Sequence, residues 1–490
     1  MNKDYESFAK PQFNLLSKGD IQYIHSNALK ILGEIGIRVD HDEGEKLLLE
    51  HGCKKLENEA ILFPIDLIET CLQSVPSEIQ IFNQKGKEAM LLGGRNNYFG
   101  TGTDLLKTYD LRTREYRLTV LQDVANAAIV SDYCKDVDFV STMGLPSDVH
   151  QNLTYIENVK TLLYNTTKPI FFTAAGKEDL EIIFKMASEV AGGRKNLRQK
   201  PFVIHYSEPT PPLSHTYGAV QKLFLCADEK LPICYVPGDI LGASCPVTLA
   251  GGITQAIAEA LSGIVLHQLR NKGSPIISGF GAVPLDMRTA IFCYGAPEFR
   301  LTNSAFADML HYYNIPMWST VGTDSFSLDS QTGFEHALGT LMAALDGAHL
   351  IHDIGYMGQG LLSNPAAILM SNEIISSVRR ILRGFKLNDD KIGLETIKKV
   401  ASSTSRSFLA EVHTLNHFRK EFWMPQISNR LDYETWIKEG KKSYADLLIA
   451  KTLEILETHK PEPLAENVRD AIESLLKEAY SKLTNIRFKA

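Results

Sequence analysis

The sequence lacks the features that mark several classes of protein. Its 490 residues contain no uninterrupted apolar run of about 18 residues, so no segment is expected to cross a membrane. The first twelve residues are polar and do not resemble a secretory signal. Lys and Arg number 51 against 58 Asp and Glu, which argues against a nucleic-acid-binding surface. We therefore expect a cytoplasmic protein that binds neither nucleic acid nor membrane.

Closely spaced metal ligands are also lacking. The seven cysteines include no C-x-x-C pair, and their odd number favours reduced thiols over a disulfide framework. His349 and His352 are three residues apart, but they lie in an apolar run typical of a strand. On a strand their side chains would point to opposite faces. We expect no metal site in this chain.

What the sequence does contain is a repeated pattern of short apolar segments, most of them followed by helical stretches. Eight such segments start 30 to 43 residues apart. They are Tyr98–Gly102, Asp138–Gly144, Pro169–Ala175, Phe202–Glu208, Pro232–Asp239, Pro275–Val283, Pro316–Thr323 and His349–Tyr356. This alternation predicts an α/β fold, the (β/α)8 TIM barrel. An open doubly wound sheet is the alternative, but no G-x-G-x-x-G motif follows the first segment.

The helical patterns between and around these segments divide the chain into three parts. Within the barrel they are Leu121–Cys134, Leu180–Ala191, Tyr217–Ala227, Gly252–Arg270, Thr302–Tyr313, Gly333–Ala344 and Asn372–Leu382. Residues 1–90 are expected to form an N-terminal helical extension, residues 91–385 the catalytic barrel, and residues 386–490 a C-terminal helical extension packed on it. The expected terminal helices are Asp20–Gly36, Glu43–Gly52, Pro64–Ser74, Phe408–Trp423, Ser443–His459 and Leu464–Leu483. The acidic, helix-rich termini are compatible with a homo-oligomer.

In a barrel of this type the reacting site lies at the C-terminal ends of the strands. The residues there nominate Glu208 and Asp104 as catalytic acids, although Asp104 could equally cap a helix. The candidate substrate-binding residues are Tyr98, Tyr206, Phe280, Phe326, His352 and Tyr356. Aromatic residues on barrel strands are often core residues, so this assignment rests on their position at strand ends.

Basic residues are absent from these strand ends, which argues against a phosphate-bearing substrate. Aromatic rings with one or two acids and no cationic partner suit a cationic organic ligand, because ring faces attract quaternary ammonium groups.

Several stretches of the chain are similar to those of one enzyme family. They are Ala28–Gly36, Tyr98–Gly102, Tyr109–Thr113, Asp329–Glu335, Ala348–Tyr356, His413–Arg419 and Glu421–Pro425. In their order and coverage they resemble the trimethylamine methyltransferase family, in its branch without pyrrolysine. No pyrrolysine is present here, and the register places the lost position near Gln331–Gly333.

The resemblance implies a methyl transfer linked to one-carbon metabolism. Members of the family pass a methyl group from a methylated amine to Co(I) of a separate corrinoid protein, so the cobalamin belongs to the partner. Relatives without pyrrolysine act on quaternary amines, and glycine betaine is the substrate that we expect. Two alternatives stay open. One is a metal-assisted lyase or hydrolase using Glu208, Asp239 and His352, and the other is a non-catalytic betaine sensor.

Overall fold

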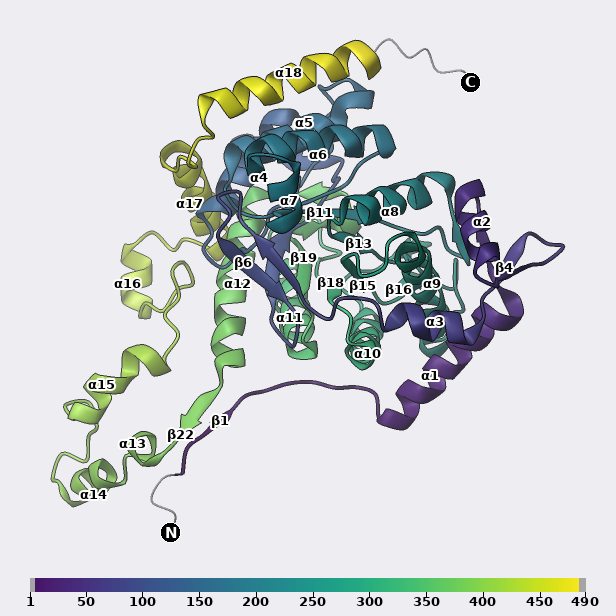
Figure 1. Ribbon diagram of the computed structural model, residues 1–490. Coiled ribbons are helices and arrows are strands. Elements are labelled where there is room, and N and C mark those ends of the chain that lie inside the picture. Colours follow the sequence, from purple (N-terminus) through teal and green to yellow (C-terminus); the bar gives the residue numbers. More distant parts are fainter. Residues whose placement is uncertain (1–4, 484–490) are drawn as a thin grey trace.

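The core of the molecule is a ring of parallel strands (Figure 1). The structure, a computed structural model, describes residues 5–483; residues 1–4 and 484–490 of the two expected extensions lie outside this range. Seven strands follow one another in the ring: β10 (Ile170–Phe172), β11 (Val203–Ser207), β13 (Ile233–Tyr235), β15 (Ile276–Gly279), β18 (Met317–Thr320), β19 (Leu350–Ile354) and β7 (Tyr98–Thr101).

The ring closes between β7 and β10 through the second of the eight expected segments. Phe139 forms a parallel bridge with Gly100, and Val140 forms one with Ile170. The segment pairs through these two bridges, and its backbone turns into a left-handed conformation at Met143 (φ 53°). With this short segment as the eighth member of the ring, the predicted TIM barrel is confirmed.

Helices surround the ring where the sequence patterns place them. They are α4 (Leu121–Tyr133), α6 (Lys177–Ala191), α8 (Tyr217–Glu229), α9 (Leu249–Arg270), α10 (Pro297–Tyr313), α11 (Ser330–Asp346) and α12 (Pro365–Arg383). The helix α5 (Thr154–Asn165) follows the second segment and was not expected. Its buried face includes Glu157 and Asn158 as well as apolar residues, and this blurs the apolar stripe by which a helix is recognised.

One of the described helices, α9, has the length and the mean hydropathy (1.5) of a membrane span. However, 72% of its most apolar stretch is buried inside the fold. It packs against α8 and against α1 (Lys18–Lys30) and α3 (Ile65–Leu72) of the N-terminal region. An outer helix that is covered on both sides needs an apolar surface all round, and this accounts for its composition.

The N-terminal region contains strands as well as the expected helices. Besides α1, α2 (Asp42–Glu50) and α3 it forms the hairpin of β5 (Ile79–Phe82) and β6 (Glu88–Leu92). Apolar side chains of this hairpin share one cluster with residues from inside the ring: Ile79, Ile81, Met90 and Leu92 with Phe139, Phe171, Ile204, Cys234, Ile277, Trp318 and Leu350. The hairpin therefore closes the end of the barrel where the strands begin.

Two small sheets rise at the other end of the barrel, where the strands end. One consists of β14 (Ile240–Leu241), β16 (Val283–Asp286) and β17 (Ile291–Phe292). The other consists of β20 (Tyr356–Met357), β21 (Leu362–Ser363), β8 (Lys107–Tyr109) and β9 (Tyr116–Leu118). We call them the rim sheets, because each one extends the loops that follow barrel strands.

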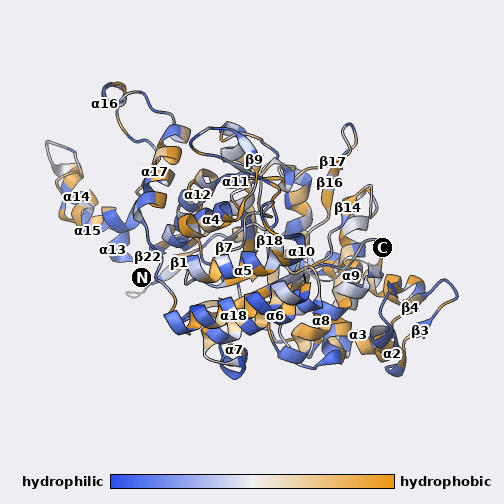
Figure 2. Cartoon of the chain, turned by 90° about the horizontal axis from the view of Figure 1, so that it is seen from above, coloured by the Kyte–Doolittle hydropathy of each residue, from blue (hydrophilic) through white to orange (hydrophobic). Residues whose placement is uncertain are grey.

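The C-terminal region has two parts that differ in packing. Its last helices, α17 (Tyr444–Thr458) and α18 (Glu466–Leu483), pack on α4, α12 and α6 of the barrel. The preceding helices form an arm that points away from the barrel (Figures 1 and 2). They are α13 (Asp389–Ile392), α14 (Leu394–Ser402), α15 (Val412–Glu421) and α16 (Tyr433–Lys438), and of their residues only Val400 is buried. The arm touches the barrel where Lys420 and Glu421, at the end of α15, accept hydrogen bonds from Arg383 and Arg380 of α12.

Candidate active site

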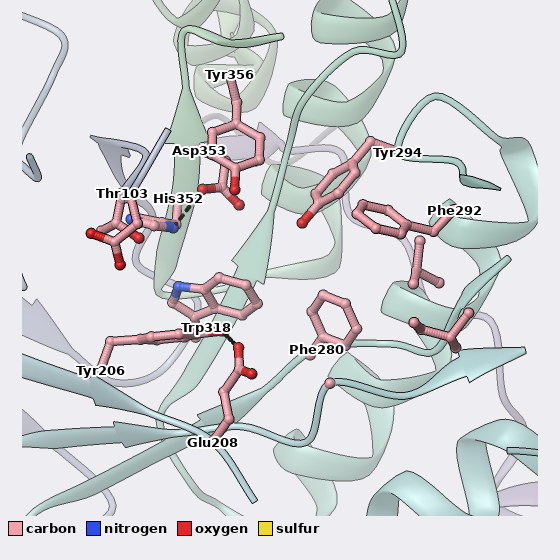
Figure 3. Close-up of a pocket in the computed structure, with 14 residues that line it drawn as sticks. Thr103, Tyr206, Glu208, Phe280, Phe292, Tyr294, Trp318, His352, Asp353 and Tyr356 are labelled. Atoms are coloured by element: carbon pink, nitrogen blue, oxygen red, sulfur yellow. Dashed lines mark hydrogen bonds and ion pairs between the residues drawn. The ribbon is translucent and has the colours of Figure 1, made fainter. Parts of the chain in front are cut away.

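A cavity of about 340 Å³ opens at the C-terminal ends of the strands, between the two rim sheets (Figure 3). Its wall consists of Thr103, Asp104, Tyr206, Glu208, Gly238, Ile240, Phe280, Val283, Phe292, Tyr294, Trp318, His352, Asp353 and Tyr356. Six of the eight residues nominated from the sequence belong to this wall: Asp104, Tyr206, Glu208, Phe280, His352 and Tyr356. They come from four different barrel strands or the loops that follow them, so only the closed ring brings them together.

The structure places the other two nominated residues elsewhere. Tyr98 is the first residue of β7, not the last, and its hydroxyl accepts a hydrogen bond from the Leu91 amide of the closing hairpin (3.0 Å). It therefore lies at the closed end of the barrel. Phe326 is 58% exposed in the loop after β18, against the Gly358 turn on the outside of the rim. This loop turns outward, and strand-end position in the sequence cannot show the direction of a loop.

Several wall residues were not nominated. Trp318 stands on a predicted strand, where a tryptophan reads as a core residue. Asp353 is outside the eight residues named above, although its position at the end of the eighth predicted segment, beside His352, did point to the site. Phe292 is the last residue of β17 and Tyr294 follows it, so the hairpin of β16 and β17 brings both to the cavity. Two short apolar runs on either side of residues 287–290 were a signal for that hairpin.

Trp318 is the centre of the aromatic part of the wall. Its ring lies 5.7 Å from Tyr206 and 5.8 Å from Phe280, measured between ring centroids (Figure 3). Tyr294 and Tyr356 form a second pair, 5.5 Å apart, nearer the rim. Burial raises the pKa of Tyr206, Tyr294 and Tyr356 above the usual range, so these phenols stay neutral. The cavity therefore presents uncharged ring faces on several sides.

The position of the Tyr356 ring depends on a glycine. A Cβ atom at Gly102 would lie 2.4 Å from Cδ2 of Tyr356, which is closer than real Cβ contacts come. Glycine at the end of β7 thus leaves room for the ring at the cavity wall.

Three carboxyl groups complete the wall. The Tyr206 hydroxyl donates to Glu208, and the Thr320 hydroxyl donates to Asp353. The Thr173 hydroxyl donates to Asp104 (2.8 Å). Asp353 also lies 2.9 Å from Nδ1 of His352, whose other ring nitrogen contacts the Ser141 hydroxyl at 3.2 Å. Neighbouring side chains thus hold each of these carboxyl groups on at least one oxygen.

Burial governs the protonation of two of these acids. It raises the pKa of Asp104 to about 6, although the bond from Thr173 and the neighbouring His352 lower it. Burial also raises the pKa of Glu208, against the lowering effects of the Tyr206 bond and of Lys222. Solvent reaches the Glu208 side chain through the cavity, while protein surrounds it on its other sides.

The backbone is strained at three wall residues. Asp104 (φ 61°), Phe280 (φ 73°) and Asp353 (φ 71°) adopt left-handed conformations that non-glycine residues rarely take. Each such residue costs roughly 1–3 kcal/mol, and such strain is typical of functional sites. All three lie at the ends of barrel strands, where the strain turns their side chains toward the cavity.

The metal-assisted alternative needs Asp239 beside Glu208 and His352. Asp239 instead faces α9, where it accepts a hydrogen bond from Gln255 (2.9 Å) and lies close to Glu259. Burial next to Glu259 raises the pKa of Asp239. Within residues 5–483, no three His, Cys, Asp or Glu side chains are grouped so that they could hold a metal ion. The segment 331–333, where the resemblance placed a lost pyrrolysine, starts α11 and does not line the cavity.

Comparison with known proteins agrees with this architecture. The crystal structure of the monomethylamine methyltransferase MtmB from Methanosarcina barkeri is similar in fold, with a TM-score of 0.52 over 97% of this chain and 90% of that chain. The two sequences are only 10% identical, so the likeness concerns the fold alone.

The sequence comparisons are more specific. The chain is 30% identical over 467 residues to the trimethylamine methyltransferase MttB of Desulfitobacterium hafniense, covering 94% of this chain and 93% of that protein. It is 28% identical over 432 residues to a glycine betaine methyltransferase of the same species, covering 88% and 89% of the two proteins. A family model described as trimethylamine methyltransferase (MTTB) matches residues 4–481. The chain therefore belongs to the trimethylamine methyltransferase family and is a methyltransferase.

Proposed function

We propose that this methyltransferase takes a methyl group from a quaternary ammonium compound and delivers it to Co(I) of a separate corrinoid protein. The observation that carries the proposal is the cavity wall, which combines aromatic rings with carboxyl groups and includes no Lys or Arg among its residues. Relatives named trimethylamine methyltransferase and glycine betaine methyltransferase support methylated amines as the substrate class.

A quaternary ammonium group suits this wall because it needs no proton for the reaction. When the N–CH3 bond breaks, its electron pair stays on the nitrogen, and the amine leaves as a neutral molecule. Reduced cobalamin, Co(I), supplies the electron pair that accepts the methyl group. The chain's own residues then have to bind the cation, direct one methyl group toward the open end of the cavity and exclude water.

The wall residues provide these functions. The faces of Trp318, Tyr206 and Phe280 attract the cation, and each such contact contributes roughly 0.5–2 kcal/mol. Glu208 adds the attraction of a carboxylate that is fixed by the Tyr206 hydroxyl. Asp104 adds a second negative charge above its pKa of about 6. We assign Glu208 and Asp104 to holding the cation and to no proton transfer.

The methyl acceptor has to approach from the rim, because the hairpin of β5 and β6 closes the other end of the barrel. Large apolar side chains are exposed on the rim sheets and their adjoining loops: Leu106, Leu118, Val247, Met287, Ile291, Phe326 and Leu361. Exposed apolar patches of this kind mark sites of protein association. We therefore assign this apolar rim to docking of the corrinoid protein.

The proposal is tested by a demethylation assay with free reduced cobalamin in place of the partner. Glycine betaine, the substrate expected from the sequence resemblance, is the reference compound, with proline betaine, carnitine and trimethylamine for comparison. We expect a tertiary amine to form from at least one quaternary compound. Demethylation of trimethylamine alone would contradict the proposal, and tight binding without any demethylation would favour the sensor alternative.

A further inference from the structure

The cavity wall contains acidic side chains but no Lys or Arg to balance them. It contains three carboxyl groups, those of Asp104, Glu208 and Asp353, and no side chain of Lys or Arg. A betaine carries a carboxylate a few bonds from its ammonium nitrogen. In a cavity of about 340 Å³ that carboxylate has to lie among the same acids. A like charge at such short range opposes binding, and more strongly in a buried site than in water.

The nearest basic side chains do not offset this charge from within the cavity. Lys222 lies behind the wall and donates to the Ala174 carbonyl (3.1 Å). Arg300 donates to the Thr320 carbonyl (2.8 Å) and stacks on the ring of Phe299. Both cations are already bound to backbone or ring groups, and neither belongs to the wall. A substrate carboxylate would find no cationic partner there.

The wall also contains hydrogen-bond donors, and some of them are already in use. The Tyr206 hydroxyl donates to Glu208, and Nε2 of His352 contacts the Ser141 hydroxyl. Nδ1 of His352 lies 2.9 Å from Asp353 but has no hydrogen-bond partner among the described residues. Within residues 5–483, one indole N–H in the wall stands out: Nε1 of Trp318 is buried and has no hydrogen-bond partner. A buried donor without a partner carries a cost that an oxygen of the ligand can remove.

We propose that the site takes a quaternary ammonium compound without a carboxylate, with a short chain that ends in a neutral oxygen such as a hydroxyl. The trimethylammonium head lies among the rings and acids, and the hydroxyl oxygen accepts from Trp318 Nε1. This inference rests on the proposed methyl transfer and narrows its substrate class. It predicts that choline-like compounds are better substrates than glycine betaine.

Choline and glycine betaine form a matched pair for the test, because they differ only in a CH2OH group against a carboxylate. Two measurements at pH 7.5 on the full chain are compared: kcat/KM for demethylation with reduced cobalamin, and Kd without cobalamin by calorimetry. We expect choline to have a kcat/KM at least tenfold higher than that of glycine betaine, and a Kd at least tenfold lower. Equal or better values for glycine betaine would overturn the inference while leaving the proposed function in place. Tighter binding of choline with turnover of neither compound would support the substrate class and overturn the proposed function.

Two variants test the hydrogen bond from Trp318 and the repulsion of a carboxylate by Glu208 separately. Trp318→Phe keeps an aromatic face but removes the indole N–H. We expect the ratio of the affinity for choline to that for tetramethylammonium to fall about three- to tenfold, because only choline has an oxygen that accepts this hydrogen bond. In Glu208→Gln we expect the preference for choline over glycine betaine to shrink severalfold. An unchanged ratio in both variants would contradict the inference. Circular dichroism and the melting temperature check that each variant is folded.

Discussion

The hydroxyl of Tyr206 donates a hydrogen bond to the carboxylate of Glu208, two residues further along the end of β11. Residues two apart on a strand share a face, so both side chains point into the cavity. Burial raises the pKa of Glu208, and the bond from Tyr206 lowers it. The tyrosine thus helps to keep a carboxylate ionised inside the fold, where it can attract a cation.

We expect Glu208→Gln to lower kcat/KM for a quaternary ammonium substrate about 10- to 100-fold. The removed interaction with a charged group is worth roughly 1.5–3 kcal/mol, and each 1.4 kcal/mol or so corresponds to a factor of ten. Glu411→Gln, at an ion pair with Lys399 outside the cavity, is the matched control. Steady-state kinetics with reduced cobalamin measure the effect. Equal kinetics of the two variants would remove Glu208 from the binding site.

The raised pKa of Asp104 leads us to expect that kcat/KM depends on pH. This pKa of about 6 lies above the usual value because burial disfavours the charged form. The carboxylate therefore appears as the pH rises through about 6, and kcat/KM for a cationic substrate should rise over the same range. In Asp104→Asn this rise should be lost, and asparagine tolerates the left-handed backbone at this position. A pH profile of kcat/KM for both proteins, with the same slope near pH 6, would refute the assignment.

Tyr98 and Tyr356 are expected to respond differently to substitution. Tyr98→Phe removes the bond from the Leu91 amide, so the free energy of unfolding should fall by about 1 kcal/mol while KM stays the same. Tyr356→Leu removes a ring from the cavity wall and should raise KM several-fold. Denaturant unfolding and substrate titrations distinguish the two effects. A change in KM for Tyr98→Phe would show that this residue has a role at the site after all.

The apolar rim yields a prediction about the partner. Met287→Glu and Phe326→Glu place a charge on exposed side chains outside the cavity wall. Methyl transfer to the cognate corrinoid protein should slow at least tenfold, because burying an unpaired charge in an interface is costly. Transfer to free reduced cobalamin, which needs no protein docking, serves as the control and should stay at the wild-type rate. Equal losses with both acceptors would place the effect on the cavity and not on docking.

The barrel could be predicted from the sequence because buried parallel strands are continuous apolar runs, and eight of them recur at regular intervals. Helix α5 was missed because it buries polar side chains such as Glu157 and Asn158. The strand-end rule found Tyr206, Glu208 and His352 because the ends of parallel strands converge on one side of a closed ring. It failed for Tyr98, which begins its strand.

The remaining wall residues depend on contacts that are distant in sequence. Phe292 and Tyr294 are brought to the cavity by the hairpin of β16 and β17. Trp318 could be placed on a strand, but its central position among rings from other strands follows from the closure of the ring. These placements come from packing, which a local pattern in one sequence does not contain.

The hairpin that closes the barrel at the start of the strands has a kinetic consequence. With one end sealed, the ammonium compound, the leaving amine and the corrinoid protein of the proposed reaction would all use the same opening. The small molecule must enter before the large partner covers it, and the amine must wait until that partner departs. Initial-rate patterns should therefore follow a compulsory order, with the small substrate binding first and its demethylated product released last.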